Sequence, residues 1–259
     1  GFYAAAAAID AHPALVAVSP QAPCLDWWQG DDMHRHGAFA LQEAFTFFYA
    51  FGHARPAPDA IERDAWLSVP WGTPDPYAYF LRLPPLASLD DAAFGGAVPQ
   101  IWKDFIAHPD YDEFWTARSH ARYLTGVRPA VLTVGGFYDA ENAYGAVHTF
   151  RAIAEGKPRG DNHVLLGPWR HHGWDRGPSQ TLGDADFGTD TSTIFPPLFV
   201  GFFEHHLKGA PDPGLPVATV FEGGADRWRR FPAWPPPGAV ARTLHFQPDG
   251  GLAWTAPPA

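Results

Sequence analysis

Cysteine is nearly absent from this sequence, and this limits both the cross-links and the metal sites that the protein can form. Cys24 is the only cysteine among the 259 residues, and this excludes a disulfide framework and a zinc site made of cysteine ligands. No glycine-rich turn surrounds it, so it is expected to be a small buried side chain and not a nucleophile. One thiol is compatible with any cellular compartment, so cysteine usage leaves the location open.

Basic residues and long apolar runs are also scarce. With 18 Lys and Arg against 28 Asp and Glu, the net charge is −10, which argues against nucleic acid or an anionic membrane surface as the main partner. The richest apolar segment, residues 195–207, contains Glu204, His205 and His206 and is shorter than the ~20 residues of a membrane helix. We therefore expect no nucleic-acid and no membrane partner.

A third absence concerns catalysis. A Gly-x-Ser-x-Gly nucleophile elbow, in which a serine stands between a strand and a helix, does not occur in the chain. Ser19 comes nearest, but Pro20 follows it where the helix should begin. The other serines lie in no strand-turn-helix context; they are Ser68, Ser88, Ser119, Ser179 and Ser192. We therefore expect no serine nucleophile within these residues.

What the chain does contain is an alternation of helices and buried strands. Hydrophobic residues make up 46% and charged residues 18%, a composition typical of a globular core. Apolar runs predict buried strands at residues 15–18, 130–134, 163–166 and 216–221. Helices are predicted at residues 2–11, 141–154 and 194–207. This alternation indicates an α/β fold with a mostly parallel sheet.

A long helical stretch interrupts this alternation between residues 26 and 128. It is dense in aromatics and proline and predicts short helices at residues 38–51, 59–64, 75–83, 99–107 and 111–120. Because a crossover needs far fewer residues, we expect an inserted helical cap over the carboxyl edge of the sheet. The predicted domains are a core at 1–25 and 129–225, a cap at 26–128, and a linker with one strand of a further β-domain at 226–259. A single strand cannot bury a face, so this last part is either an arm or a truncated domain.

Two polar side chains follow successive predicted strands. Asp139 comes after a strand and a Gly-Gly pair, and His171 comes after the next strand and a Gly-Pro pair. Carboxyl ends of parallel strands meet at one edge, and an acid followed by a histidine is the order in which α/β-hydrolases supply two triad members. The sequence therefore predicts Asp139 as the orienting acid and His171 as the general base. Asp139 could instead cap the helix that starts near Glu141.

Several segments carry a family resemblance. They are Gly1–Ala5, Asp10–Leu15, Val18–Pro23, Gly30–Asp32, His36–Phe39, Asp139–Glu141 and Gly167–His171. Together they resemble the CocE/NonD hydrolases, which include α-amino-acid ester hydrolases, glutaryl-type cephalosporin acylases and Xaa-Pro dipeptidyl-peptidase-like acyl hydrolases. The resemblance runs from Gly1 to about Pro248. It implies a partial α/β-hydrolase core with an inserted helical cap and the beginning of a C-terminal β-sandwich near Arg242.

The resemblance also implies where the nucleophile lies. The family motif reads Gly-x-Ser-Tyr-x-Gly-Phe, and Gly1-Phe2 match its last two residues, which places the serine three residues before Gly1. The family's oxyanion-hole donors belong to the same preceding part. We therefore expect this chain to be a fragment of a serine hydrolase and to be inactive alone.

The substrate contacts implied by the resemblance lie close to the acid. Three carboxylates hold the substrate ammonium in α-amino-acid ester hydrolases, and by motif they fall on Asp32, Glu141 and Asn142. The third position departs from the pattern because it carries an amide, so α-amino acyl substrates are less strongly implied. Asp32 and Glu141 could equally be a solvated loop pair. Tyr138 and Trp169 are predicted walls of an aromatic acyl pocket.

The predicted function is cleavage of an ester or amide bond, acyl or dipeptidyl, in a small-molecule substrate. The alternative is a non-catalytic ligand-binding protein, or a decayed hydrolase paralogue, that uses an aromatic pocket. No cofactor is implied, and no zinc site is expected because adjacent histidines such as His205 and His206 point apart. Homo-oligomerisation of the longer protein and a periplasmic or secreted location are left open.

Overall fold

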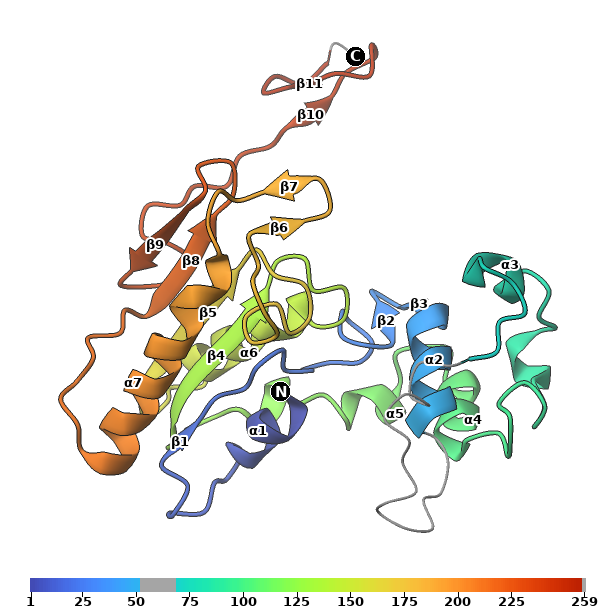
Figure 1. Cartoon of the computed structure of the whole chain (residues 1–259), viewed down its shortest axis with the longest axis horizontal. Coiled ribbons are helices and arrows are strands. Elements are labelled where there is room, and N and C mark those ends of the chain that lie inside the picture. Colours follow the sequence, from blue (N-terminus) through green and yellow to red (C-terminus); the bar gives the residue numbers. More distant parts are fainter. Residues whose placement is uncertain (52–68, 258–259) are drawn as a thin grey trace.

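A five-stranded sheet forms the centre of the molecule. The computed structural model of the chain describes residues 1–51 and 69–257. In spatial order the strands are β1 (Ala17–Val18), β4 (Ala130–Gly136), β5 (Asn162–Gly167), β8 (Ala218–Glu222) and β9 (Arg227–Phe231) (Figure 1). The first four are parallel, and β9 pairs antiparallel with β8 at one edge. The predicted, mostly parallel α/β-hydrolase core is thereby confirmed, while β9 was not foreseen.

Strand β4, which lies between β1 and β5, positions the loop that carries Asp139. All seven of its residues are buried, as expected for a strand covered on both faces, whose side chains need to be apolar on both sides. β4 and β5 pair in register up to Gly136 opposite Gly167. The two strands therefore end side by side, and the loops that follow them start from neighbouring points.

Helices cover both faces of the sheet, following the alternation of side chains along the strands. Leu132 and Val134 pack with Phe195 and Phe202 of α7 (Phe195–Lys208). The opposite face of β4 is covered by α6 (Ala143–Glu155), where Val131 belongs to the same buried cluster as Ile153. A Cβ atom at Gly135 would lie 2.3 Å from the Cβ atom of Ala146, so glycine is required for this helix to pack closely. No helix of the described residues combines the length and the apolar character needed to cross a bilayer.

The first helix is shorter than the sequence predicted. It is α1 (Phe2–Ala7), and a turn follows it instead of the expected helical continuation to residue 11. Ala8 and Val18 belong to a cluster that packs beside β4 and α6. The other short elements of the core are η3 (Ala121–Tyr123), β6 (Thr181–Leu182), β7 (Ala185–Asp186) and η4 (Thr191–Ile194).

A helical region stands beside the sheet between β1 and β4 (Figure 1). Its elements are β2 (His34–Arg35), β3 (Ala38–Phe39), α2 (Leu41–Phe51), α3 (Pro76–Phe80), η2 (Leu86–Ser88), α4 (Gln100–Ala107) and α5 (Glu113–Thr116). It has a hydrophobic core of its own, centred on buried aromatic rings such as Phe45, Trp102 and Trp115. The helix predicted at residues 59–64 lies outside the described residues.

The last described residues form an extended arm. Two short strands, β10 (His245–Phe246) and β11 (Leu252–Ala253), pair as an antiparallel hairpin that projects away from the sheet (Figure 1). Large apolar side chains on it are open to solvent, with Phe246 84% exposed and Trp254 60% exposed. The single strand predicted here is thus half of a hairpin whose apolar side chains are largely exposed, although the guanidinium of Arg242 lies over the Trp254 ring.

Candidate active site

The loops that follow β4 and β5 are joined by their backbones. Phe137 N–H donates to the carbonyl of Gly167 at 2.9 Å, and Tyr138 N–H donates to the carbonyl of Trp169 at 3.1 Å. A Cβ atom at Gly136 would lie 2.1 Å from the Trp169 carbonyl oxygen. Glycine at this strand end therefore permits a close approach that a side chain would block. The backbones of the two loops are therefore fixed relative to one another without any contribution from the side chains of Asp139 and His171.

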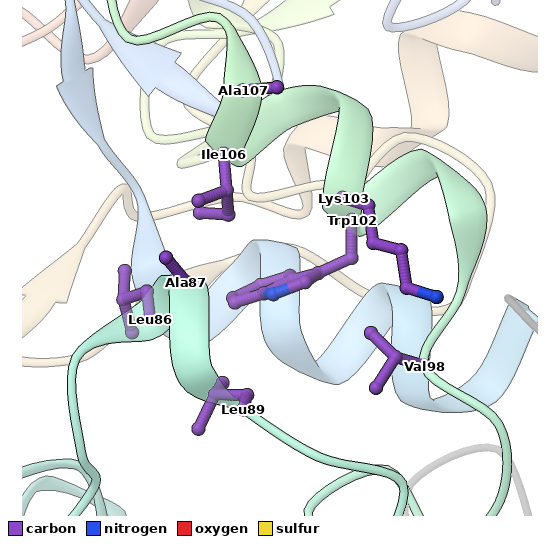
Figure 2. A pocket seen from close by; sticks show the side chains of 8 residues that line it. All are labelled: Leu86, Ala87, Leu89, Val98, Trp102, Lys103, Ile106 and Ala107. Atoms are coloured by element: carbon purple, nitrogen blue, oxygen red, sulfur yellow. The ribbon is translucent and has the colours of Figure 1, made fainter.

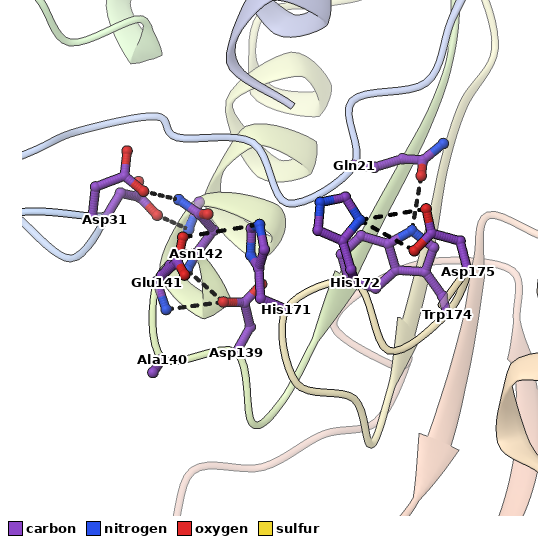
Figure 3. A network of polar contacts seen from close by, with 12 residues as sticks. Gln21, Asp31, Asp139, Ala140, Glu141, Asn142, His171, His172, Trp174 and Asp175 are labelled. Atoms are coloured by element: carbon purple, nitrogen blue, oxygen red, sulfur yellow. Dashed lines mark hydrogen bonds and ion pairs between the residues drawn. The ribbon is translucent and has the colours of Figure 1, made fainter. Parts of the chain in front are cut away.

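These joined loops bring Asp139 and His171 into contact. Nδ1 of His171 lies 2.9 Å from Oδ2 of Asp139 (Figure 3). The Asp139 side chain is fully buried, whereas the His171 side chain is 32% exposed. An imidazole fixed at Nδ1 by a buried carboxylate presents Nε2 to solvent, and that is the geometry in which a histidine can move a proton to or from a substrate.

The second carboxylate oxygen of Asp139 holds the start of α6. Oδ1 accepts the N–H groups of Glu141 at 2.9 Å and Asn142 at 3.0 Å. These amides belong to the unpaired donors that precede a helix. Asp139 thus uses one oxygen for the turn that leads into α6 and the other for His171, while the N-cap residue of α6 is Asn142 and not the Asp139 that the sequence also suggested. The bonds to the turn fix the direction in which Oδ2 points.

The pKa values of the pair are displaced in opposite directions. Burial alone would raise the pKa of Asp139, but the hydrogen bond and charge of His171, with the two amides, lower it below its ordinary value. Burial alone would lower the pKa of His171, but Asp139, followed by Glu141 and Asp32, raises it. Surrounding carboxylates thus favour the imidazolium form of His171.

The three residues implied as substrate contacts lie next to this pair. Oε2 of Glu141 is 3.9 Å from Nε2 of His171, and burial, the first cause, raises the pKa of Glu141. Asp32 accepts a hydrogen bond at each oxygen: Oδ1 from Nδ2 of Asn142 at 2.9 Å, and Oδ2 from Nε1 of Trp27 at 3.1 Å. Asn142 is only 3% exposed, so its amide serves Asp32 and offers little surface to a ligand.

The two predicted pocket walls occupy very different environments. Tyr138 is 55% exposed beside the pair, so its ring is open to a ligand. Trp169 is fully buried, and its Nε1 donates to Oγ1 of Thr191 at 2.9 Å. The Trp169 side chain therefore packs beneath the surface and supports the loop that carries His171. In this structure no part of its ring is exposed to a substrate.

Further polar residues of the region escaped the sequence analysis. His172, directly after the predicted base, has Nδ1 3.1 Å from Oδ1 of Asp175 and stacks on Trp174, whose Nε1 donates to Oε1 of Gln21 at 2.8 Å. Asp31 is completely buried next to Asp32. The consecutive acids Asp31 and Asp32 were a signal in the sequence, but the pattern does not indicate which of the two turns inward.

Most serine hydroxyls of the described residues bond to partners other than the pair. The hydroxyl groups of Ser19, Ser88, Ser179 and Ser192 donate to Leu132, Pro85, Gly173 and Asp190, and Ser68 lies outside the described residues. Across residues 1–51 and 69–257, no group of three or more His, Cys, Asp or Glu side chains is placed to hold a metal ion. Cys24 is buried, and burial raises the pKa of its thiol.

A hollow of about 370 Å³ lies in the helical region, between η2 and α4 (Figure 2). Its walls are apolar apart from Lys103 and the indole of Trp102. Neither Asp139 nor His171 lines it. Most aromatic side chains of this region pack against one another in its core, so the abundance of aromatic residues is largely explained by folding.

Residues 1–173 match the X-Pro dipeptidyl-peptidase (S15) family. The chain belongs to this family. Membership confirms the resemblance to the CocE/NonD hydrolases, and the matched residues contain both Asp139 and His171. Among curated relatives, the cocaine esterase of Rhodococcus sp. (strain MB1 Bresler) is 29% identical over 179 residues, which is 66% of this chain and 29% of that protein.

Solved structures of hydrolases have the same fold as this S15-family chain. An aminopeptidase from the marine sediment archaeon Thaumarchaeota archaeon superposes with a TM-score of 0.82 at 32% identity, covering 97% of this chain and 40% of its own. An α-amino acid ester hydrolase superposes with a TM-score of 0.81 at 27% identity, covering 100% and 42%. The chain thus spans less than half the length of these relatives.

Proposed function

We propose that this S15-family chain supplies the acid and the general base of a serine hydrolase that cleaves ester or amide bonds. The observation that carries the proposal is the contact between Nδ1 of His171 and the buried Oδ2 of Asp139 at 2.9 Å. Asp139 fixes the tautomer of the imidazole and stabilises the imidazolium that forms, while Nε2, 3.9 Å from Oε2 of Glu141, is the atom that exchanges a proton.

In the proposed reaction, His171 acts twice. Nε2 takes the proton of a serine hydroxyl as the oxygen attacks the substrate carbonyl carbon. The imidazolium then gives the proton to the departing alcohol or amine, and the acyl-serine ester forms. Water, deprotonated by the same nitrogen, hydrolyses that ester and regenerates the serine.

The nucleophile in this proposal is a serine that precedes α1 in a longer polypeptide. Two observations support it. The serine hydroxyls described above are engaged elsewhere, and the N-terminus of α1 abuts the loop after β1, since a Cβ atom at Gly1 would lie 2.2 Å from the carbonyl oxygens of Gln21 and Ala22. That loop follows the same edge of the sheet as the Asp139 and His171 loops, because Gln21 bridges to Val134 of β4.

The proposed substrate is a small ester or amide, and the local charge favours a cationic group on it. Asp32 and Glu141 place negative charge next to Nε2 of His171, and Tyr138 offers an exposed ring beside them. A charge-assisted bond from an ammonium to each carboxylate is worth about 1.5–3 kcal/mol. Esters, amides and Xaa-Pro peptides are all compatible with this arrangement.

The test is a substitution series in a longer polypeptide that includes the segment preceding Gly1. His171→Ala and Asp139→Asn should each lower kcat by roughly 10³–10⁴-fold or more, measured on α-amino esters, other esters and Xaa-Pro amides. His172→Ala is the matched control, since the adjacent imidazole faces Asp175 and should change kcat little. Full activity of His171→Ala would contradict the proposal, and so would equal losses in His171→Ala and His172→Ala.

A further inference from the structure

Asp31 is the most deeply buried carboxylate of the region and belongs to none of the roles described so far. Its exposure is 0%, and it lies beside Asn142 at the start of α6 (Figure 3). An ionised carboxylate removed from water is costly unless hydrogen bonds compensate it. The partners of Asp31 therefore indicate what this burial achieves.

Three backbone amides from two distant segments donate to Asp31. Oδ2 accepts the N–H groups of Leu25 at 2.8 Å and Asp26 at 3.0 Å, while Oδ1 accepts the N–H of Gly145 at 2.7 Å. The first two belong to the segment that leads from β1 to the helical region. Gly145 belongs to the first turn of α6, where N–H groups lack a partner within the helix. One carboxylate thus joins the helix to the loop.

The fit at this junction is tight. A Cβ atom at Gly145 would lie 1.8 Å from the carbonyl oxygen of Pro23 and 2.5 Å from Oδ1 of Asp31. Asp32, the next residue, has a φ of 47°, a left-handed conformation that non-glycine residues keep only when their surroundings hold them. Its N–H donates to the carbonyl of Glu141 at 2.9 Å, so the neighbouring residue completes the connection to the loop before α6.

We propose that Asp31 is a positioning residue for the candidate active site: it clamps the loop that carries Asp32 to the helix start that carries Glu141 and Asn142. Without the clamp, the amide of Asn142 and the carboxylate of Asp32 would lose the spacing at which they bond. This role in positioning rests on the proposed function, because it assumes that Asp32 and Glu141 belong to the active site. The test measures the pKa of His171 in the folded chain and requires no measurement of catalytic activity.

The pKa of His171 is the readout, because Asp32 is one of the charges that raise it. Asp31→Asn replaces one acceptor oxygen by an NH₂ group, which would face either the loop amides or the Gly145 N–H, donor against donor. The imidazole signals of His171 are followed by NMR from about pH 5 to 9, with His171→Gln identifying them. We expect Asp31→Asn to lower the pKa of His171 as Asp32→Asn does, and the double variant to lower it no further.

Asp26→Asn is the matched control. Asp26 is also buried in this loop, at 5% exposure, but it accepts from Trp28, Gln29 and the hydroxyl of Tyr111, all outside α6. It should reduce thermal stability and leave the pKa of His171 in place. An unchanged His171 pKa in Asp31→Asn, or an equal decrease in Asp26→Asn, overturns the proposal.

A second measurement uses the unaltered protein in case Asp31→Asn does not fold. Burial, partly offset by the amides, raises the pKa of Asp31 to about 7. The backbone amide signals of Leu25, Asp26 and Gly145 should therefore move with the side-chain carboxyl ¹³C signal of Asp31, at one common midpoint. A Gly145 amide that does not follow Asp31 would show that the clamp is absent.

Discussion

Asn142 donates its side-chain amide to the carboxylate of Asp32, with 2.9 Å between Nδ2 and Oδ1, although the two residues stand 110 positions apart. A carboxylate at position 142 would meet Asp32 as a like charge, whereas the amide meets it as a donor. The amide at position 142 therefore acts as an internal support for Asp32.

The first prediction follows from that contact. Asn142→Asp should destabilise the fold by about 1–3 kcal/mol at neutral pH, because two carboxylates would share the distance of one hydrogen bond. The loss should shrink at acid pH, where one of the carboxyl groups takes up a proton and becomes a donor. Thermal unfolding at two pH values measures the difference. Asn142→Ala removes the bond without adding charge, and an equal pH dependence in that variant would contradict the electrostatic explanation.

The second prediction concerns pH. Although burial opposes it, Asp139, Glu141 and Asp32 raise the pKa of His171, so the neutral imidazole needed as a base appears only at higher pH. Glu141→Gln removes one of these charges and should shift the acid limb of the pH–rate profile of the longer protein to lower pH. Glu155→Gln, on the exposed far end of α6, should leave the profile unchanged. If the pH–rate profile of Glu141→Gln matches that of the unaltered protein, the prediction is wrong.

The same pair sets opposite trends in stability. Because folding raises the pKa of His171, its contribution is complete below the unfolded pKa and is lost as the pH rises through the folded value. Because folding lowers the pKa of Asp139, its contribution is present above the unfolded pKa and is lost as the pH falls through the folded value. Glu141→Gln should therefore reduce stability on the acid side of the His171 titration more than on the alkaline side, which chemical unfolding at several pH values can measure.

The third prediction concerns the close approach of the two loops. Gly136→Ala would place a methyl group 2.1 Å from the carbonyl oxygen of Trp169, so the loops must separate. We expect the free energy of unfolding to decrease by about 1–3 kcal/mol. Gly223→Ala is the control, because no heavy atom lies within 4 Å of the added carbon. Unfolding midpoints in urea compare the two, and similar midpoints would refute the steric account.

The fourth prediction separates a packed core from an aromatic binding pocket. Phe45 of α2 is fully buried and contacts Phe94 and Trp102, so Phe45→Ala should cost about 3–5 kcal/mol. Phe47, on the same helix and 45% exposed, should cost far less when replaced by Ala. Thermal unfolding measures both. A negligible cost for Phe45→Ala would favour an open aromatic pocket over a packed core.

Much of the core could be predicted from the sequence because its signals are local. An uninterrupted apolar run such as residues 130–134 is what a strand buried on both faces requires, and it became β4. The edge strand β9 was missed because Arg227, Arg229 and Arg230 give it the polarity of a loop. Only pairing with β8 shows that these exposed arginines lie on a sheet edge.

The candidate site likewise contains contacts that the sequence predicted and contacts that it did not. The order of Asp139 and His171 after successive strands was sufficient to predict that they meet, since parallel strands end at a common edge. The inward turn of Asp31, the burial of Trp169 and the use of Asn142 as a donor to Asp32 could not be predicted from the pattern.

By itself the sequence determined the four parallel strands of the sheet and the acid and histidine that follow two of them, because hydrophobic periodicity and chain order are properties of neighbouring residues. The tertiary structure alone decided which further polar groups face one another around Asp139 and His171. Those contacts join segments more than a hundred residues apart, as in the bonds from Gly145 to Asp31 and from Asn142 to Asp32. Such pairings depend on how two loops pack against one helix, and no local pattern encodes that geometry.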